Sequence, residues 1–111
     1  DGHLESVSVE LGRAVRVEEV VKTFRSFDSE PFRLGCPSAV NPTIVVRSEP
    51  DRPQAWLDRK VGRGMAVTVG RVRPCEVFDV KFVVLSHNTI RGAAGGAVLN
   101  AELMVAKGMI G

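Results

Sequence analysis

The chain opens with alternating residues, which is the pattern of a β-strand. One face of residues 3–11 carries His3, Glu5, Val7, Val9 and Leu11. Because successive side chains of a strand point to opposite faces, this alternation predicts a strand over residues 3–11. His3 lies at the leading end of its apolar face.

A helical period follows the first strand. Apolar residues recur at spacings of three and four positions at Val17, Val20, Val21, Phe24 and Phe27. This spacing gathers them into one stripe and predicts an amphipathic helix over residues 17–27. A strand followed by such a helix favours a layered α+β arrangement.

The middle of the chain contains three strand-like runs separated by connections rich in proline and glycine. The runs cover residues 43–47, 65–73 and 77–85. Only residues 74–76 separate the last two runs, which should pair as an antiparallel hairpin. Residues 28–42 have the composition of a loop. Residues 48–64 form a long connection that is either a functional loop or an arm anchored by Trp56.

The C-terminal segment has the clearest period. Its apolar residues fall on one helical stripe at Ile90, Ala94, Ala97, Val98, Ala101, Met104 and Val105. They predict a long helix over residues 89–107, with Asn88 at the N-cap position and Gly108 near the end. The whole pattern predicts an α+β fold: a largely antiparallel sheet with helices on one face, plus a long C-terminal helix.

Composition restricts the class of protein further. The 111 residues suffice for one domain at most. Lys and Arg number 15 against 13 Asp and Glu, and 5% of residues are aromatic. This balance argues against a nucleic-acid partner, which needs a basic surface and stacking rings. No apolar run approaches the roughly 18 residues of a membrane span, and no signal peptide opens the chain, so we expect a cytoplasmic protein with no membrane partner.

The two cysteines, Cys36 and Cys75, lie far apart in the sequence and have no histidine at metal-ligand spacing. Neither a disulfide framework nor a metal site is predicted. A thiolate can attack a carbonyl, but Cys36 lacks the helix N-terminus or nearby cation that activates such a thiol. We interpret both as ordinary thiols of the core or of a loop.

Two histidines and one junction could carry chemistry. His3 can take and return a proton near neutral pH, although a lone histidine at a strand end is more often structural or solvated. His87 precedes the predicted helix, where it can simply belong to a strand-to-helix turn. Residues 88–97 form a strand-to-helix junction, where free backbone amides at the helix start favour a phosphate or a carboxamide. Their small side chains let a flat group or a neighbouring backbone come close. The alternative for this junction is a close helix-packing face with Asn88 as a plain cap.

Arginines offer a further candidate group, because a guanidinium can hold an anionic substrate through two hydrogen bonds. Scattered arginines, however, mostly coat protein surfaces. The candidates are Arg47, Arg52, Arg59, Arg63, Arg71 and Arg73.

Four segments together resemble the C-terminal part of aspartate-semialdehyde dehydrogenase, most closely the archaeal and fungal type. They are Asp1-Gly2-His3, Asp51-Arg52-Pro53-Gln54, residues 64–73 (GMAVTVGRVR) and residues 86–95 (SHNTIRGAAG). The resemblance spans nearly the whole chain. Its most specific part is the last segment, with its continuation to Leu103. The chain starts at Asp1 without an initiator methionine, and we expect it to be a piece of a longer polypeptide.

The resemblance implies two domains with different tasks. A preceding Rossmann-type domain would bind NADP and carry the catalytic cysteine, and a second domain would supply a catalytic histidine and the dimer interface. His3 matches that histidine, and Asn88 with Gly92 matches the helix start beside the nicotinamide. Residues 1–85 would belong to the catalytic and dimerisation domain. Residues 86–111 would form a helix that packs back on the NADP-binding domain.

The resemblance also implies a reaction. In this family a thiolate attacks the aldehyde of L-aspartate 4-semialdehyde, hydride passes to NADP, and phosphate releases aspartyl phosphate. Biosynthesis of lysine, threonine and methionine uses the reverse direction. The family's nucleophilic cysteine, nucleotide-binding glycines and substrate-binding arginine are not among these residues. The chain should therefore be inactive alone and need the N-terminal half as its partner, in a homo-oligomer.

Two alternatives remain beside this function. One is an acyl-CoA reductase of the same fold, such as malonyl-CoA reductase, and N-acetyl-glutamyl-phosphate reductase is a less similar relative. The other is a non-catalytic dimerisation module. His87 is a departure from the family pattern, because many relatives carry an acidic residue before the Asn at this helix start.

Overall fold

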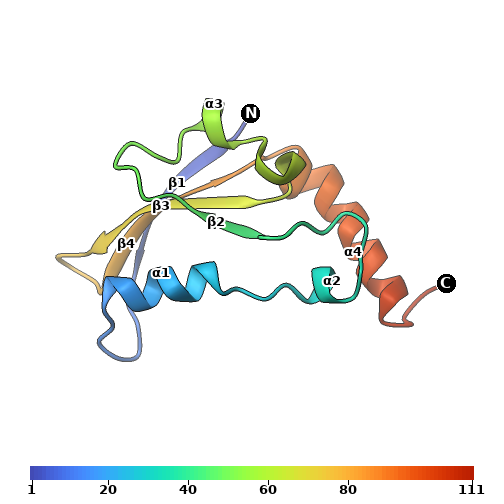
Figure 1. Ribbon diagram of the computed structural model, residues 1–111, viewed down its shortest axis with the longest axis horizontal. Coiled ribbons are helices and arrows are strands. Elements are labelled where there is room, and N and C mark those ends of the chain that lie inside the picture. The colour runs from blue at the N-terminus through green and yellow to red at the C-terminus, as the bar shows by residue number, and fades with distance from the viewer.

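The computed structural model describes all 111 residues, which form a four-stranded mixed sheet flanked by helices (Figure 1). The strands are β1 (His3–Val9), β2 (Ile44–Val46), β3 (Val67–Pro74) and β4 (Val80–Ser86), in the spatial order β1-β4-β3-β2. Strand β4 pairs antiparallel with both β1 and β3, whereas β2 runs parallel to β3. The predicted α+β fold with a largely antiparallel sheet is confirmed, and so is the β3–β4 hairpin.

Helix α1 (Val17–Arg25) packs against the sheet through its apolar stripe. The ring of Phe24 meets Phe82 of β4 edge-on, with centroids 5.3 Å apart and planes at 76°. Edge-to-face contacts of this kind add to the burial of both rings. The helix ends earlier than the predicted range of 17–27, because Ser26 leaves the helical conformation at the C-cap. Phe27, beyond it, is 52% exposed.

Two predicted connections contain short helices. The predicted loop 28–42 includes α2 (Glu30–Arg33), and the connection 48–64 includes α3 (Ala55–Asp58) and a 3-10 turn, η1 (Val61–Gly64). Hydrophobic periodicity cannot predict such short helices, because four residues do not define a period of 3.6. Figure 1 shows α3 and α1 on opposite sides of the sheet.

Residues 48–59, here called the arm, are anchored by a carboxylate. Trp56 does not anchor the arm, because it is 79% exposed, whereas Asp58 is only 2% exposed. The arm lies directly on β3: a Cβ added at Gly70 would overlap the carbonyl oxygen of Arg52. Only glycine permits so close an approach of one backbone to another.

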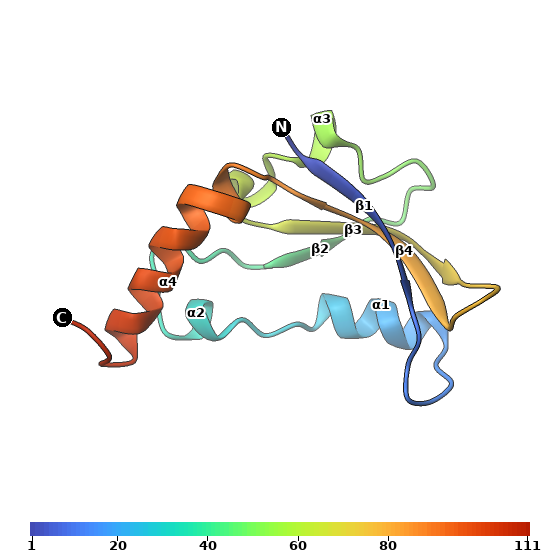
Figure 2. The ribbon, with the colours of Figure 1, turned by 180° about the vertical axis from the view of Figure 1, so that it is seen from behind.

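Helix α4 (Gly95–Ala106) crosses the end of the sheet (Figure 2), and a π-helical turn, η2 (Ile90–Ala94), precedes it. Leu99 joins the buried core cluster, whose other members are Cys36, Val40, Met65 and Ala66. The predicted helix over residues 89–107 is present, but its first turn is wider than an α-helix. There the N–H of Gly92 donates to the carbonyl of His87, five residues back, at 3.0 Å. None of the helices is both long and apolar enough to span a bilayer.

Candidate functional site

An open hollow of about 410 Å³, here called the His3 hollow, lies where β1 begins and β4 ends. It is lined by His3, Glu5, Val84, Ser86, Asn88 and Gly92. His3 lies directly opposite Ser86 in the antiparallel pair, and Glu5 lies opposite Val84. Directly opposite residues stand on the same face of a sheet, so all four side chains share one surface. The fold thus brings together the three predicted site residues from the two ends of the chain.

Two lining residues, Glu5 and Ser86, were not predicted as site residues. Glu5 shares a strand face with His3, which the alternation in the sequence does show. Ser86 reaches the hollow only through the register of β1 against β4. No sequence period encodes that register, because it joins segments more than 70 residues apart.

Asn88 does not cap the helix as predicted. Its Oδ1 accepts the backbone N–H of Gly2 at 2.8 Å, and this hydrogen bond ties the end of β4 to the residue before His3. Gly2 has a φ of +101°, in the left-handed region that favours glycine. Figure 2 shows that β1 starts at the same end of the sheet from which the chain leads into α4.

His87 performs the capping instead. Its Nδ1 accepts the backbone N–H groups of Thr89 and Ile90, at 3.3 and 3.2 Å. These N–H groups belong to the start of the helical segment and have no carbonyl partner within it. His87 is 6% exposed. The structural reading of His87, as a residue of the strand-to-helix turn, is therefore correct.

The small residues of the junction have two different environments. A Cβ at Gly95 would lie 2.5 Å from Sδ of Met65, so this glycine serves close helix packing. A Cβ at Gly92 would meet only the carbonyl oxygen of His87, at an ordinary 3.6 Å. Gly92 is exposed and lines the His3 hollow, so nothing within the chain requires a glycine there.

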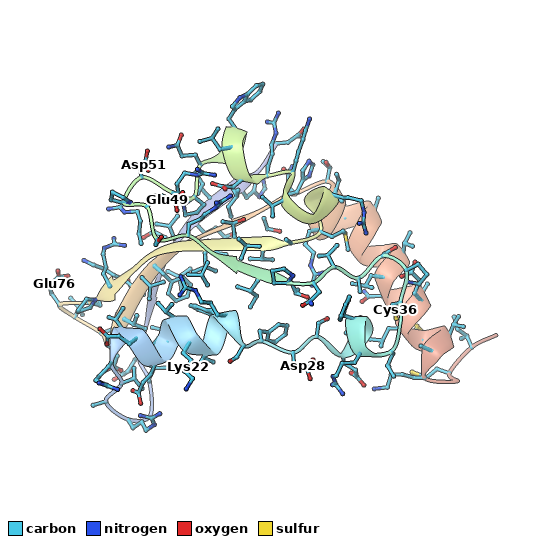
Figure 3. The ribbon with its side chains drawn as sticks, in the orientation of Figure 1. Lys22, Asp28, Cys36, Glu49, Asp51 and Glu76 are labelled. Carbon is cyan, nitrogen blue, oxygen red and sulfur yellow. The ribbon has the colours of Figure 1, made fainter.

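Neither cysteine lines the His3 hollow. Cys36 is buried in the core cluster beside α4 (Figure 3). Cys75 lies in the turn between β3 and β4, at the far end of β4, which is about 20 Å long over Val80–Ser86. The N–H of Phe78 donates to Sγ of Cys75 at 3.4 Å. This bond, with a second from the N–H of Val77, lowers the pKa of the thiol.

Two of the candidate arginines hold Asp58 of the arm. Nε of Arg52 lies 2.8 Å from Oδ2 and Nε of Arg47 lies 3.1 Å from Oδ1. The hydrogen bonds from Arg52, followed by the backbone N–H of Gln54, lower the pKa of Asp58 although burial opposes them. Arg59 instead stacks on the ring of Trp56, 4.8 Å from its centroid. The buried acid was missed, because nothing in the local sequence distinguishes it from a surface aspartate.

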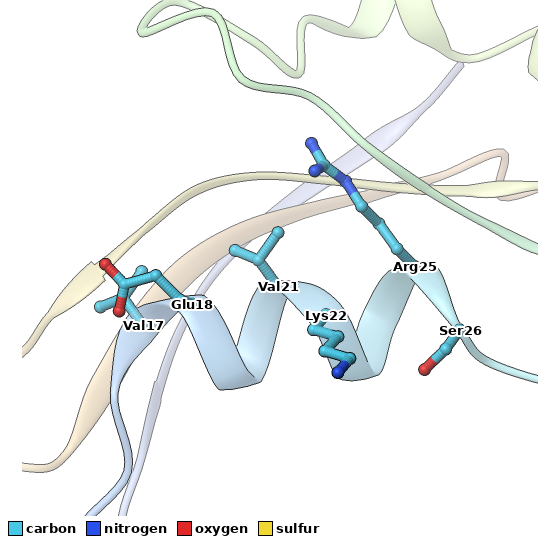
Figure 4. Close-up of a pocket in the computed structure, with 6 residues that line it drawn as sticks. All are labelled: Val17, Glu18, Val21, Lys22, Arg25 and Ser26. Atoms are coloured by element: carbon cyan, nitrogen blue, oxygen red, sulfur yellow. The ribbon is translucent and has the colours of Figure 1, made fainter.

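A second groove of about 480 Å³ runs along α1 (Figure 4), lined by Val17, Glu18, Val21, Lys22, Arg25 and Ser26. It contains none of the predicted site residues, and its charged groups alternate with valines along one helix. No group of three or more His, Cys, Asp or Glu side chains could hold a metal ion. The His3 hollow, which all three predicted site residues line, is the candidate site.

Comparisons with known proteins agree on one family. Residues 1–91 match the family described as semialdehyde dehydrogenase, dimerisation domain. The aspartate-semialdehyde dehydrogenase of Archaeoglobus fulgidus is 50% identical over 110 residues, which cover 99% of this chain and 31% of the relative. That of Aspergillus fumigatus is 49% identical over 115 residues, with 99% of this chain and 32% of the relative covered.

Solved structures give the same likeness. The crystal structure of aspartate-semialdehyde dehydrogenase with NADP from Candida albicans superimposes with a TM-score of 0.90 at 46% identity. It covers 99% of this chain and 31% of the Candida chain. The aspartate-semialdehyde dehydrogenase II of Vibrio cholerae gives a TM-score of 0.73 at 29% identity. The chain spans about a third of the length of the curated relatives that it matches.

Proposed function

This chain belongs to the semialdehyde dehydrogenase dimerisation domain family, and we propose that it is the C-terminal part of an NADP-dependent aspartate-semialdehyde dehydrogenase. The observation that supports this proposal most strongly is that His3, Asn88 and Gly92 line the same hollow. These are the positions to which the family resemblance assigns roles. The proposed reaction converts L-aspartate 4-semialdehyde and phosphate into aspartyl phosphate, or the reverse in biosynthesis.

His3 is proposed as the acid and base. Its side chain is exposed at the start of an edge strand and faces an open hollow, so a substrate held by another part of the protein can reach it. As a base, the imidazole takes the proton from the hydroxyl of the cysteine-bound substrate, and it returns that proton in the reverse reaction. The pairing of His3 with Ser86 fixes the backbone from which the imidazole projects.

Asn88 and Gly92 suit the nicotinamide end of NADP. The amide of Asn88 uses its oxygen on Gly2 and keeps two N–H donors for a ligand. Gly92 exposes backbone without a side chain, which allows a flat group to approach closely. These two residues would hold the carboxamide and the ring. When bound, NADP supplies the hydride acceptor.

The nucleophilic cysteine and the nucleotide-binding glycines are proposed to come from an N-terminal half of the same protein. Exposed apolar residues on α4 support a partner segment there, since Val98 is 51% and Val105 is 55% exposed. Residues 86–111 would thus pack back on the NADP-binding domain, while residues 1–85 belong to the catalytic and dimerisation domain. The dimerisation family supports a homo-oligomer. The two free cysteines support a cytoplasmic location.

The test uses the protein expressed from the complete reading frame that contains this chain. NADPH formation is followed by absorbance with aspartate semialdehyde, NADP and phosphate, and each component is omitted in turn. Turnover that requires phosphate supports the proposal. A second mixture contains coenzyme A in place of phosphate, and turnover that requires coenzyme A assigns the acyl-CoA reductase instead. A folded oligomer that turns over neither mixture leaves only the dimerisation module.

A further inference from the structure

We infer that Asn88 is a positioning residue for His3, because its side-chain oxygen holds the backbone directly before that histidine. The inference rests on the proposed function in one respect, namely that His3 carries the proton. It goes beyond that function because it gives Asn88 a second task, independent of any contact with NADP.

The hydrogen bond lies at the point where β1 begins. The ladder between β1 and β4 starts with His3 opposite Ser86, so Gly2 lies just outside it. The N–H of Gly2 finds its partner in Oδ1 of Asn88, at 2.8 Å in a partly buried setting. Terminal residues of an edge strand fray when their backbone groups have no partner. Without Asn88, the N–H of Gly2 would lose this partner, and the backbone directly before His3 would be held less firmly.

His87 makes this contact possible. An asparagine between a strand and a helix normally turns its oxygen toward the N–H groups of the first helical turn. Here Nδ1 of the buried His87 ring already accepts the N–H groups of Thr89 and Ile90. The side chain of Asn88 is therefore available to reach across to β1.

The same hydrogen bond orients the other end of the amide. A backbone N–H can bond only to the oxygen of Asn88, so the oxygen faces Gly2 and the NH₂ group is directed away from it. Asn88 also lines the His3 hollow. One side chain thus joins the start of the segment 86–111 to the strand that carries the proton donor. The oxygen positions His3, and the NH₂ group remains for a ligand.

Three variants of the complete protein separate these two tasks. Asn88→Ala removes the acceptor and the donors, whereas Asn88→Asp keeps an acceptor oxygen, loses the donors and adds a carboxylate charge. Asn41→Ala makes the same truncation at an exposed position before β2, outside the segment 86–111, and serves as the matched control. Three readouts apply to each: the imidazole signals of His3 by NMR, the hydrogen exchange of the Gly2 amide, and kcat with the KM for NADP.

We expect Asn88→Ala to speed exchange at Gly2, to shift the His3 signals and to lower kcat by about 10- to 100-fold, as misplacement of a reacting group does. Asn88→Asp should retain slow exchange at Gly2 and a clearly higher kcat than Asn88→Ala, with a raised KM for NADP. Each kcat is taken from the plateau of its pH profile, because the added carboxylate changes the profile itself. Asn41→Ala should resemble the unmutated protein in all three readouts.

Two results would overturn the inference. One is an equal loss of kcat in Asn88→Ala and Asn88→Asp with unchanged His3 signals, which would leave Asn88 acting on the cofactor alone. The other is fast exchange of the Gly2 amide in the unmutated protein, a measurement that holds even if Asn88→Ala fails to fold. NMR and exchange need no turnover. If the protein lacks dehydrogenase activity but both readouts respond as expected, the proposed function fails and the positioning contact stands.

Discussion

Arg52 binds the buried carboxylate of Asp58 through two nitrogens, with Nε 2.8 Å from Oδ2 and Nη2 2.6 Å from Oδ1. This bidentate pair fixes the arm, residues 48–59, against the sheet. The arm in turn packs against the backbone next to the candidate site. A Cβ at Gly2, next to His3, would lie only 3.3 Å from the Cβ atoms of Ala55 and Arg59. Stability of the arm and placement of His3 are therefore linked.

Replacement of Asp58 by alanine should destabilise the protein strongly. It leaves Arg47 and Arg52, whose side chains are 30% and 17% exposed, without their carboxylate. Breaking one side of a buried ion pair costs about 3 kcal/mol. The measurement is the urea midpoint of unfolding, with Asp51→Ala as control because Asp51 is exposed and belongs to the same arm. Equal midpoints for the two variants would contradict the anchoring role.

The stability should also depend on pH through the same group. The hydrogen bonds from Arg52 and from the Gln54 N–H place the pKa of Asp58 below its ordinary value in the folded protein. In acid the unfolded chain therefore binds a proton more readily than the folded one, and stability falls as pH falls. The loss begins below about pH 4, the unfolded value, and is complete below the folded pKa. Urea midpoints measured down this range should fall more steeply for the unmutated protein than for Asp58→Ala.

Two glycines of the helical junction should respond oppositely to alanine. Gly95→Ala places a methyl group against Sδ of Met65 and the carbonyl of Ile90, so we expect a loss of about 1–3 kcal/mol from overpacking. Gly92→Ala has room for the methyl group, and alanine favours a helix over glycine by up to about 1 kcal/mol. Thermal midpoints of the two variants test this difference. A midpoint for Gly92→Ala as low as that of Gly95→Ala would refute it.

Loss of the His3 imidazole should abolish most turnover. In the complete protein, His3→Ala should lower kcat by a factor on the order of 10² to 10⁴, with the affinity for NADP nearly unchanged. Ser6→Ala is the control, because Ser6 is an exposed residue of the same strand with its side chain on the other face. Steady-state kinetics and NADP titration give both quantities. If His3→Ala retained a large part of kcat, the proposal that His3 acts as the acid and base would be wrong.

Cys75 should be the more reactive of the two thiols in this chain. It is partly exposed, and the N–H groups of Phe78 and Val77 lower its pKa, whereas Cys36 is buried in the core. Alkylation by iodoacetamide, followed by peptide mass spectrometry, should modify Cys75 first. Its rate should reach half of its maximum below the pH of about 8.5 that is usual for a free thiol. Faster modification of Cys36 would show that the core opens in solution.

Cys75→Ser should leave kcat unchanged, because Cys75 lies at the end of β4 opposite the His3 hollow. A large loss of turnover in this variant would place the nucleophile in the hairpin turn. It would contradict the proposal that the nucleophile comes from another part of the protein.

Much of the fold could be predicted because it rests on long periodic segments. The alternation from His3 onward and the stripe from Ile90 to Val105 each identify their element without help from the rest of the chain. The short helices α2 and α3 could not be predicted, since one turn has no period. Asn88 was predicted as a cap because its type and place suit one. The structure gives that task to His87, whose ring nitrogen is an acceptor as well.

The residues alone were sufficient for the types of the long elements, the hairpin and the family resemblance, since each of these depends on residues that are close together in the sequence. They also offered His3 and the junction 88–97 as candidates, and the family resemblance selected Asn88 and Gly92 within that junction. Only the tertiary structure decided that these residues share one hollow with Glu5 and Ser86, and that Asp58 lies buried between two arginines. The physical reason is that such contacts depend on strand register and on how the chain folds back on itself. These long-range choices are made by packing, and no local pattern of residues records them.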